Sequence, residues 1–370
     1  MINSPEKQEE TIFKIALSLV PKVGNKTALE LIKYYGNALS IFEHSTLQEL
    51  CQFSTIKPSS ANIILKKKTV ARAEKEWIFT QKYAIKILSQ EMSEYPKRLR
   101  NCYDAPFLLY HKGTNNLNAS KIVAIVGTRK PTEKGRAFCE QLVNDLACYN
   151  PLIVSGLAYG IDITAHKKCI DLSVPNIGVV AHGLDRIYPQ KHKKTAQMIV
   201  ENGGILTEFL SETEPVPRHF PMRNRIIAGM ADAVVVVETA TRGGSMITAH
   251  IANEYNKDVF AVPGRLDDKL SQGCNHLIKT HRASLLESAD DIAYILRWKK
   301  QKAGNQKQIF TELNEQERKI IDLLVGQEDV HLDSIINNTG ISTSRIASLL
   351  LELEFKGLIR AIPGKRFRLI

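Results

Sequence analysis

Three small residues that follow an apolar segment of this chain are suited to holding an anion. The segment is Val234–Val237, a run of four valines typical of a strand buried on both faces of a sheet. Gly243, Gly244 and Ser245 follow where the chain turns from this strand into a helix predicted over residues 246–256. Paired glycines leave backbone N–H groups uncovered, and the positive N-terminus of a helix favours negative charge. We therefore predict that this turn holds phosphate.

A second group of polar residues, Arg223, Asn224 and Arg225, lies in the helical pattern before the valine run. Guanidinium groups offer planar, bidentate donors that match phosphate. The two arginines are two positions apart, so they cannot share one face of a helix. We expect one to hold the ligand and the other to bridge to the surrounding structure.

Glycines, small hydroxyl residues and cations also follow three other predicted strands. Ligands of an open parallel sheet lie beyond the carboxyl ends of its strands, so these residues are expected on one side of the sheet. Arg129 could instead pair with a loop carboxylate, and the lysines could simply be the solvated start of a helix. The predicted contributors are Gly127, Thr128, Arg129, Ser155, Gly156, Lys191, Lys193 and Lys194.

Several kinds of catalytic and cofactor site lack their signatures in this sequence. There is no G-x-G-x-x-G or P-loop motif, no G-x-S-x-G nucleophile elbow, and no metal-ligand spacing among His166, His182 and His250. Asp162 follows a glycine at a predicted helix start, where an N-cap is favoured over a catalytic base. No carboxylate lies in the glycine turn. We expect no catalysis, no cofactor and no metal.

The elements that position these residues alternate between strand and helix over residues 81–298. Short apolar strands separated by helices of 10 to 15 residues predict an α/β domain, a Rossmann-like parallel sheet covered on both faces. The strands are predicted over residues 122–126, 152–154, 177–181, 204–208, 233–238, 259–262 and 284–287, after two short ones at 84–88 and 107–110.

Two smaller domains are predicted to flank this one. Residues 1–80 read as helices joined by a tight turn at Pro21–Lys26, which resembles a helix-hairpin-helix (SAM-like) domain, with a weaker echo at Phe53–Pro58. Gly24 is expected to let the hairpin N–H groups face outward. Residues 299–309 read as a basic linker, and residues 310–370 as a winged helix of three helices and a terminal hairpin.

The composition favours a reducing compartment and a polyanionic partner. The chain of 370 residues carries a net charge of +11, yet residues 310–370 hold eight basic and nine acidic side chains. A basic chain suits nucleic acid, and the near-neutral C-terminal segment does not. The six cysteines form no C-x-x-C pair, no apolar run reaches the length of a membrane span, and the N-terminus is too acidic for a leader. We expect a cytoplasmic protein without a membrane contact.

The motifs taken together resemble the DprA/Smf family (DNA-processing protein A) in order and spacing over about residues 84–290. The matching segments are GTR (127–129), SGLAYGID (155–162), AH (165–166), GLDRIYP (183–189), FPMRNRIIAGM (220–230), GGSMITA (243–249) and VFAVPG (259–264).

This resemblance implies a protein that binds single-stranded DNA, forms a homodimer and loads RecA recombinase onto DNA during natural transformation, without catalysis. Arg129 and Lys193 would then be cations that contact DNA. Many family members have Ser-Gly-Ser where this chain has Gly243-Gly244-Ser245. The change keeps the backbone donors.

Two competing hypotheses come from other function classes. One is a Rossmann-like nucleotide phosphoribohydrolase, whose P-G-G-x-G-T-x-x-E motif supplies a catalytic glutamate. The chain instead has Ser245–His250 after its glycines, with no carboxylate. The other is a transcription regulator that reads duplex DNA with its winged helix, which the near-neutral C-terminal segment disfavours.

Overall fold

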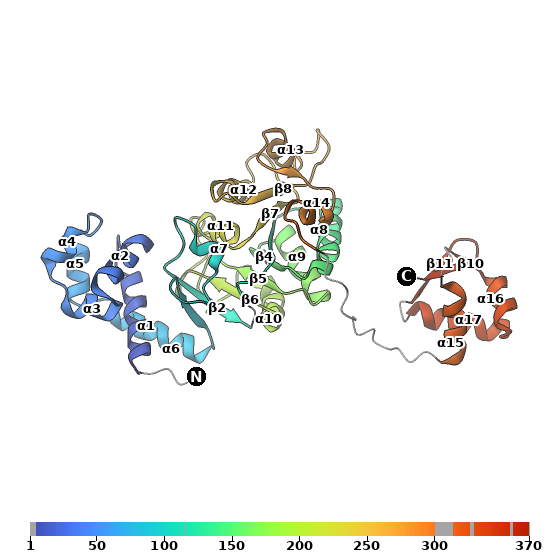
Figure 1. Ribbon diagram of the computed structural model, residues 1–370, viewed down its shortest axis with the longest axis horizontal. Helices are drawn as coiled ribbons and strands as arrows, with labels where there is room; N and C mark the ends of the chain where they lie inside the picture. The colour runs from blue at the N-terminus through green and yellow to red at the C-terminus, as the bar shows by residue number, and fades with distance from the viewer. Residues whose placement is uncertain (1–4, 115, 300–313, 326–328, 356–357, 370) are drawn as a thin grey trace. The chain divides into compact units, whose positions relative to one another are not determined.

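The structure is a computed structural model that describes residues 5–114, 116–299, 314–325, 329–355 and 358–369. The chain folds into two compact units, Met1–Gln301 and Lys302–Ile370 (Figure 1). The predicted linker over residues 299–309 lies outside the described residues except for Lys299. No helix in the described ranges is long and apolar enough to cross a membrane.

A nine-stranded sheet forms the centre of the larger unit within its described residues, in the order β1-β2-β6-β5-β4-β3-β7-β8-β9. The strands from β3 to β9 run parallel, whereas β1 and β2 add antiparallel at one edge. This confirms the predicted Rossmann-like parallel core. The strands are β1 Lys86–Ser89, β2 Leu108–Gly113, β3 Ile122–Val126, β4 Leu152–Ser155, β5 Asn176–Val179, β6 Gly203–Thr207, β7 Ala233–Val236, β8 Asp258–Ala261 and β9 Ser284–Leu285.

Helices cover both faces of this sheet, because successive side chains of a strand point to opposite faces. Val234 and Val236 of β7 pack with α7, α11, α12 and α13, and Val235 packs with α8, α9 and α14. α10 packs on Ile205 of β6. The helices are α7 Lys97–Arg100, α8 Glu133–Leu146, α9 Ile161–Asp171, α10 Lys193–Glu201, α11 His219–Met230, α12 Gly244–Glu254, α13 Gln272–Lys279 and α14 Ala289–Ile295, with short 3₁₀ turns at Ala147–Tyr149 and Gln190–His192.

The order of the strands reverses between β3 and β7. β3 pairs with β4 on one side and with β7 on the other, so the connections that leave these two strands diverge. A crevice opens at such a reversal, beyond the carboxyl ends of the strands. The residues that follow β3 and β7 therefore meet at one place.

Six helices form the N-terminal part of the larger unit within the described residues (Figure 1). Their apolar core includes Phe107 and Leu108 next to the sheet. Glu76 is 1% exposed and accepts hydrogen bonds from the backbone N–H and hydroxyl of Ser211, which lies after β6. The helices are α1 Pro5–Ser18, α2 Asn25–Tyr35, α3 Ala38–His44, α4 Leu47–Gln52, α5 Pro58–Leu65 and α6 Val70–Lys82.

The two predicted hairpins of this part contact each other. The Thr27 hydroxyl lies 2.9 Å from that of Thr55, and the Ser60 hydroxyl donates to the Pro21 carbonyl at 2.7 Å. Gly24 is the N-cap of α2 and has an extended backbone (φ −80°), a conformation that any residue adopts. The left-handed residue of the turn is Lys22, with φ 66°.

The smaller unit has the predicted winged-helix pattern of helices followed by a hairpin. The Asn314 side chain caps α15 and forms a capping box with Glu317. A short strand, β10, adds to the hairpin, and the sequence had not indicated it. The elements are α15 Glu315–Leu324, β10 Val330–His331, α16 Leu332–Thr339, α17 Thr343–Phe355, β11 Ile359–Ile362 and β12 Arg366–Leu369.

Candidate functional site

A cavity of about 640 Å³ opens at the strand reversal, beyond the carboxyl ends of β3 and β7. Its walls come from the turn after β3, from the first half of α11 and from the start of α12. Some of the predicted residues do not line it: Arg225, Ser155, Gly156 and the three lysines. Those that line it are Gly127, Thr128, Arg129, Arg223, Asn224, Gly243, Gly244 and Ser245.

The N-terminus of α12 forms one wall of this cavity. The helix begins at Gly244, two residues earlier than predicted. Its N-cap residue is Gly243, so no N-cap side chain accepts a hydrogen bond from the first N–H groups of the helix. Ser245 is 7% exposed, and its Oγ has no hydrogen-bond partner in the described part of the chain. A buried hydroxyl without a partner is costly, and the first N–H groups of a helix need acceptors. This wall therefore suits an anion with several acceptor oxygens.

Arg129 is an exposed cation that lines the cavity. Its guanidinium forms no hydrogen bond or ion pair with the described residues, so the loop carboxylate considered as a partner is not found there. The guanidinium lies over the ring of Phe220, 5.3 Å from the ring centroid. Phe220 also contacts Tyr188, whose ring centroid is 6.1 Å away and whose side chain is 47% exposed. A cation and two rings thus border the cavity together.

Arg223 is buried at the floor of the same cavity, with 4% of its surface exposed. Its Nη1 donates to the carbonyl oxygens of Gly156 and Val179, at the ends of β4 and β5. A Cβ on Gly156 would lie 2.2 Å from that nitrogen, so only glycine leaves room for it. Burial lowers the pKa of Arg223 to about 10, and the charge of Asp162 opposes this shift.

Asp162 is not the predicted N-cap of its helix. The N-cap of α9 is Gly160, whose φ of 80° and close packing against Thr128 exclude a larger residue. Asp162 is therefore the second residue of α9, and its carboxylate accepts a hydrogen bond from the Ala158 N–H at 3.3 Å. Burial raises the pKa of its carboxyl group, and nearby Arg223 opposes this effect.

Arg225 points away from the cavity and bridges two parts of the structure. Its guanidinium pairs with Glu208 and donates to the Asp104 carbonyl. Both members of the pair are about nine-tenths buried, with side-chain exposures of 11% each. Burial raises the pKa of the Glu208 carboxyl group, and the Arg225 charge opposes this shift.

Ser155 and the three lysines lie beside the cavity rather than in its wall. Ser155 is fully buried, and its hydroxyl donates to the Ile125 carbonyl at 2.6 Å. Lys191, Lys193 and Lys194 are exposed at the start of α10 and form no ion pair with the described residues. Nδ1 of His192, which lies among them, is 2.8 Å from the Leu157 carbonyl oxygen after β4, so this segment is tied to the sheet edge.

Sequence reasoning missed part of the wall. Pro215 and Pro217 line the cavity from the loop before α11, and Leu270 lines it from the loop after β8. The two prolines are a signal that could have been used, because they mark an ordered, non-helical segment next to the arginine motif. Leu270 left no comparable signal.

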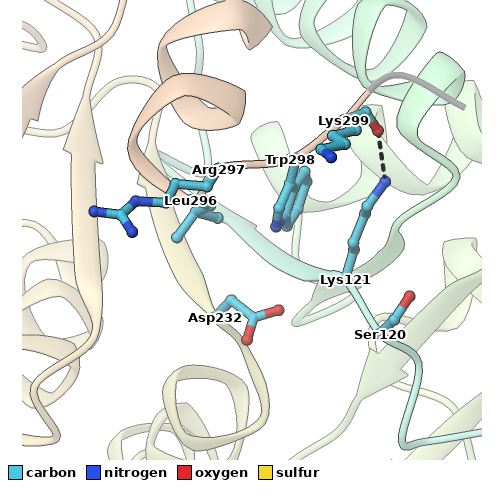
Figure 2. A pocket seen from close by; sticks show the side chains of 7 residues that line it. All are labelled: Ser120, Lys121, Asp232, Leu296, Arg297, Trp298 and Lys299. Carbon is cyan, nitrogen blue, oxygen red and sulfur yellow. Dashed lines mark hydrogen bonds between the residues drawn. The ribbon is translucent and has the colours of Figure 1, made fainter.

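A second hollow, of about 430 Å³, lies at the amino ends of β3 and β7 (Figure 2). Two of its charged side chains, Lys121 and Asp232, already have partners. Lys121 donates to the carbonyls of Tyr149 and Lys299, and Asp232 pairs with Arg98. Since ligands of such sheets bind at the other edge, this hollow is not the candidate site. Among the described residues there is no group of three or more side chains that could hold a metal ion.

Comparison with known proteins adds the family. Residues 86–297 match the family model described as DNA recombination-mediator protein A, and residues 307–365 match the DprA winged helix domain. The DNA processing protein DprA of Streptococcus pneumoniae is 42% identical over 199 residues, which is 54% of this chain and 70% of that protein. Protein Smf of a Synechocystis species is 33% identical over 316 residues, 76% of this chain and 79% of that protein.

Two solved structures are similar as well. The X-ray structure of DprA from Streptococcus pneumoniae superposes with a TM-score of 0.67 at 33% identity, over 79% of this chain and 98% of that one. DNA processing protein A from Helicobacter pylori, described for its unique single-stranded DNA binding mode, gives a TM-score of 0.53 at 31% identity. It covers 58% of this chain and 96% of its own.

Proposed function

The chain belongs to the DprA/Smf family of DNA recombination-mediator proteins, and we propose that it binds single-stranded DNA in the cavity beyond β3 and β7. We propose further that it protects the bound strand and loads RecA recombinase onto it during natural transformation. The family membership confirms the resemblance found in the sequence. The similarity to the Helicobacter pylori protein supports the choice of single-stranded DNA as the ligand.

The observation that carries this proposal is a pair of unsatisfied groups in one cavity. Within the described residues, the buried Ser245 hydroxyl at the N-terminus of α12 has no hydrogen-bond partner, and the Arg129 guanidinium forms no hydrogen bond or ion pair. The Ser245 hydroxyl would hold a phosphate through a hydrogen bond, and the Arg129 guanidinium through hydrogen bonds and its charge.

A strand of DNA suits the surroundings of the cavity better than a small anion does. The rings of Tyr188 and Phe220 offer faces on which bases can stack, which contributes about 1–3 kcal/mol per base. Lys191, Lys193 and Lys194 lie at the start of a helix, where cations are unfavourable by about 0.3–1 kcal/mol each. A bound backbone phosphate would remove that penalty. We therefore propose that the strand runs from the cavity toward these lysines.

The carboxylates near the cavity support a binding role without catalysis. Asp162 faces the Arg223 charge, and Glu238 accepts from the backbone and hydroxyl of Thr132 at the start of α8. Neither follows the glycine turn, where the phosphoribohydrolase motif has its glutamate. Incubation with nucleoside monophosphates tests this point, because release of free base would show the hydrolase activity.

DNA binding is tested with Arg129→Ala and Lys193→Ala in a gel-shift assay on poly-dT. Loss of a charge-assisted hydrogen bond predicts that Arg129→Ala weakens binding by about 1.5–3 kcal/mol, and Lys193→Ala should weaken it less. The control is Lys7→Ala, which removes one exposed charge from α1. If both variants bound poly-dT like the parent protein, the proposed site would be wrong.

Self-association and the RecA contact are further parts of the proposal. We propose a homodimer, and that the near-neutral winged helix serves protein contacts rather than duplex binding. Light scattering gives the mass in solution, and a monomer at micromolar concentration would contradict the dimer. RecA loading predicts faster nucleation of RecA filaments on single-stranded DNA when this protein is present.

A further inference from the structure

His182 is a buried histidine just after the carboxyl end of β5. Its spacing in the sequence does not suit a metal ligand, and the proposed function gives it no role. It is 1% exposed, and both of its ring nitrogens are engaged. Nδ1 lies 2.8 Å from the Gly183 carbonyl oxygen, and Nε2 accepts the backbone N–H of Tyr188 at 3.1 Å. A carbonyl can only accept, so Nδ1 must carry the proton. Both bonds are made by the neutral ring.

The second bond joins His182 to the DNA site. Tyr188 lines the main cavity and also the smaller one, of about 30 Å³, which His182 itself lines. The Tyr188 ring packs on Phe220, over which Arg129 lies. The chain between His182 and Tyr188 is a loop. The hydrogen bond to the Tyr188 N–H holds the backbone from which the Tyr188 ring extends toward the cavity.

We propose that neutral His182 is a positioning residue that holds Tyr188 at the cavity for base stacking, and that its protonation releases Tyr188 and weakens binding of single-stranded DNA. Protonation would place an Nε2–H against the Tyr188 N–H, so two donors would face each other. This inference rests on the proposed function, because it concerns the same site.

The surroundings keep the ring neutral near neutral pH. Burial lowers the pKa of His182 below its ordinary value of 6.5. The hydrogen bond to the Gly183 carbonyl and the Asp185 charge oppose this shift, and the Arg223 charge adds to it. Arg129, from the turn after β3, and Tyr159, from the loop after β4, line the same small cavity. β6 adds the Thr207 hydroxyl, which donates to the His182 carbonyl at 2.9 Å.

The sign of the effect follows from the lowered pKa. The stabilisation that neutral His182 provides is present above pH 6.5 and is lost as the pH falls through the folded-state pKa. Binding of DNA should therefore weaken on the acid side. Since acid acts on the whole protein, the comparison must be made with a variant that changes His182 alone.

The decisive variant is His182→Gln, because a glutamine oxygen can accept the Tyr188 N–H but does not titrate. We expect parent and variant to bind poly-dT alike at about pH 7.5. At the pH below 6.5 where NMR shows the His182 ring to be protonated, the parent should lose roughly fivefold relative to the variant, the equivalent of one hydrogen bond. His281→Gln, which changes an exposed histidine, should follow the parent at both values. A parent-to-variant ratio that is constant with pH would overturn the proposal.

A double-mutant cycle separates positioning from a general loss of structure. If His182 acts through Tyr188, then His182→Ala weakens binding in the parent but adds nothing to Tyr188→Ala. Additive losses would contradict the proposal, and circular dichroism shows whether each variant is folded.

An NMR measurement without DNA keeps the inference distinct from the proposed function. The protection of the Tyr188 amide, which is its exchange rate compared with the intrinsic rate at the same pH, should fall at the pH where the His182 ring titrates. An amide that stayed protected through that titration would count against the positioning role, whether or not the protein binds DNA. Failure of the parent protein to bind poly-dT near neutral pH would instead contradict the proposed function alone.

Discussion

Two neighbouring glycines at the start of α12 have different roles. A Cβ on Gly243 would lie 2.2 Å from the Thr239 hydroxyl oxygen, whereas a Cβ on Gly244 would meet nothing within 4 Å. Gly243 is therefore needed for packing. Gly244 lines the cavity and leaves its own N–H open to a ligand.

Alanine at each position should separate these roles. Gly243→Ala is expected to lower the free energy of unfolding by about 1–3 kcal/mol, because the added methyl group overpacks the turn. Gly244→Ala should leave the unfolding free energy nearly unchanged and weaken poly-dT binding by about 1 kcal/mol, because the methyl group stands in the cavity. Urea unfolding and gel shifts measure the two effects. A Gly244→Ala variant that binds normally would argue against a phosphate at this wall.

The pairing of Arg225 with Glu208 predicts a loss of stability rather than of DNA contact. Arg225→Met keeps much of the side-chain volume but leaves the buried carboxylate uncompensated, which costs about 3–5 kcal/mol. Without the arginine, the pKa of Glu208 rises further above its ordinary value of 4.5. A raised carboxyl pKa favours the folded state at low pH, so the deficit should be smaller at about pH 5 than at about pH 7.5. Urea unfolding at both values tests this, with exposed Arg242→Met as the control.

At the scale of elements, the strands could be predicted because each is a short apolar run. Their ends in the structure differ from the prediction by three residues or fewer. The meeting of the glycines and Arg129 at one cavity could also be predicted, because the carboxyl ends of parallel strands lie at the same edge of a sheet. What could not be predicted depends on tertiary contacts. Asp162 lies near the Arg223 charge, Arg225 pairs with Glu208, and the Ser155 hydroxyl bonds to a neighbouring strand. Local patterns do not contain these partners.

The start of α8 gives an element-scale prediction. Glu238, just after β7, accepts from the backbone N–H of Thr132 at 2.9 Å and from its hydroxyl at 2.5 Å. Glu238→Ala should remove this support and cost about 1–2 kcal/mol, as loss of a helix cap does. Amide exchange in the first turn of α8 should speed up. Glu140→Ala, an exposed change in the same helix, should leave those amides protected. Unchanged exchange in Glu238→Ala would mean that Thr132 caps the helix without support from Glu238.

At the scale of the whole molecule, the positive charge lies away from the C-terminal unit. The net charge is +11, but residues 310–370 hold eight basic and nine acidic side chains. Binding of single-stranded DNA should therefore be a property of the remainder of the chain, and it should weaken steeply with salt.

A chain that ends at residue 309 tests this distribution of charge. Its affinity for poly-dT should stay within about twofold of the full chain, and the slope of log affinity against log salt should be unchanged. Each neutralised phosphate contributes roughly 0.7 to that slope on single strands. Lys7→Ala should keep the slope, and Arg129→Ala should reduce it by about that amount. A smaller slope in the truncated chain would mean that the winged helix touches DNA.

The contact between Glu76 and Ser211 bears on how such a protein can evolve. Ser211 lies in the loop between β6 and α11, which also carries Pro215 and Pro217 of the cavity wall, so the N-terminal helices support one side of the cavity. A gene fusion that replaced residues 1–80 with another domain would remove the Glu76 carboxylate. The Ser211 N–H and hydroxyl would then be buried without an acceptor, or the loop would be exposed to water. The N-terminal part is therefore not a freely exchangeable module, and its inheritance should be tied to that of the loop it supports.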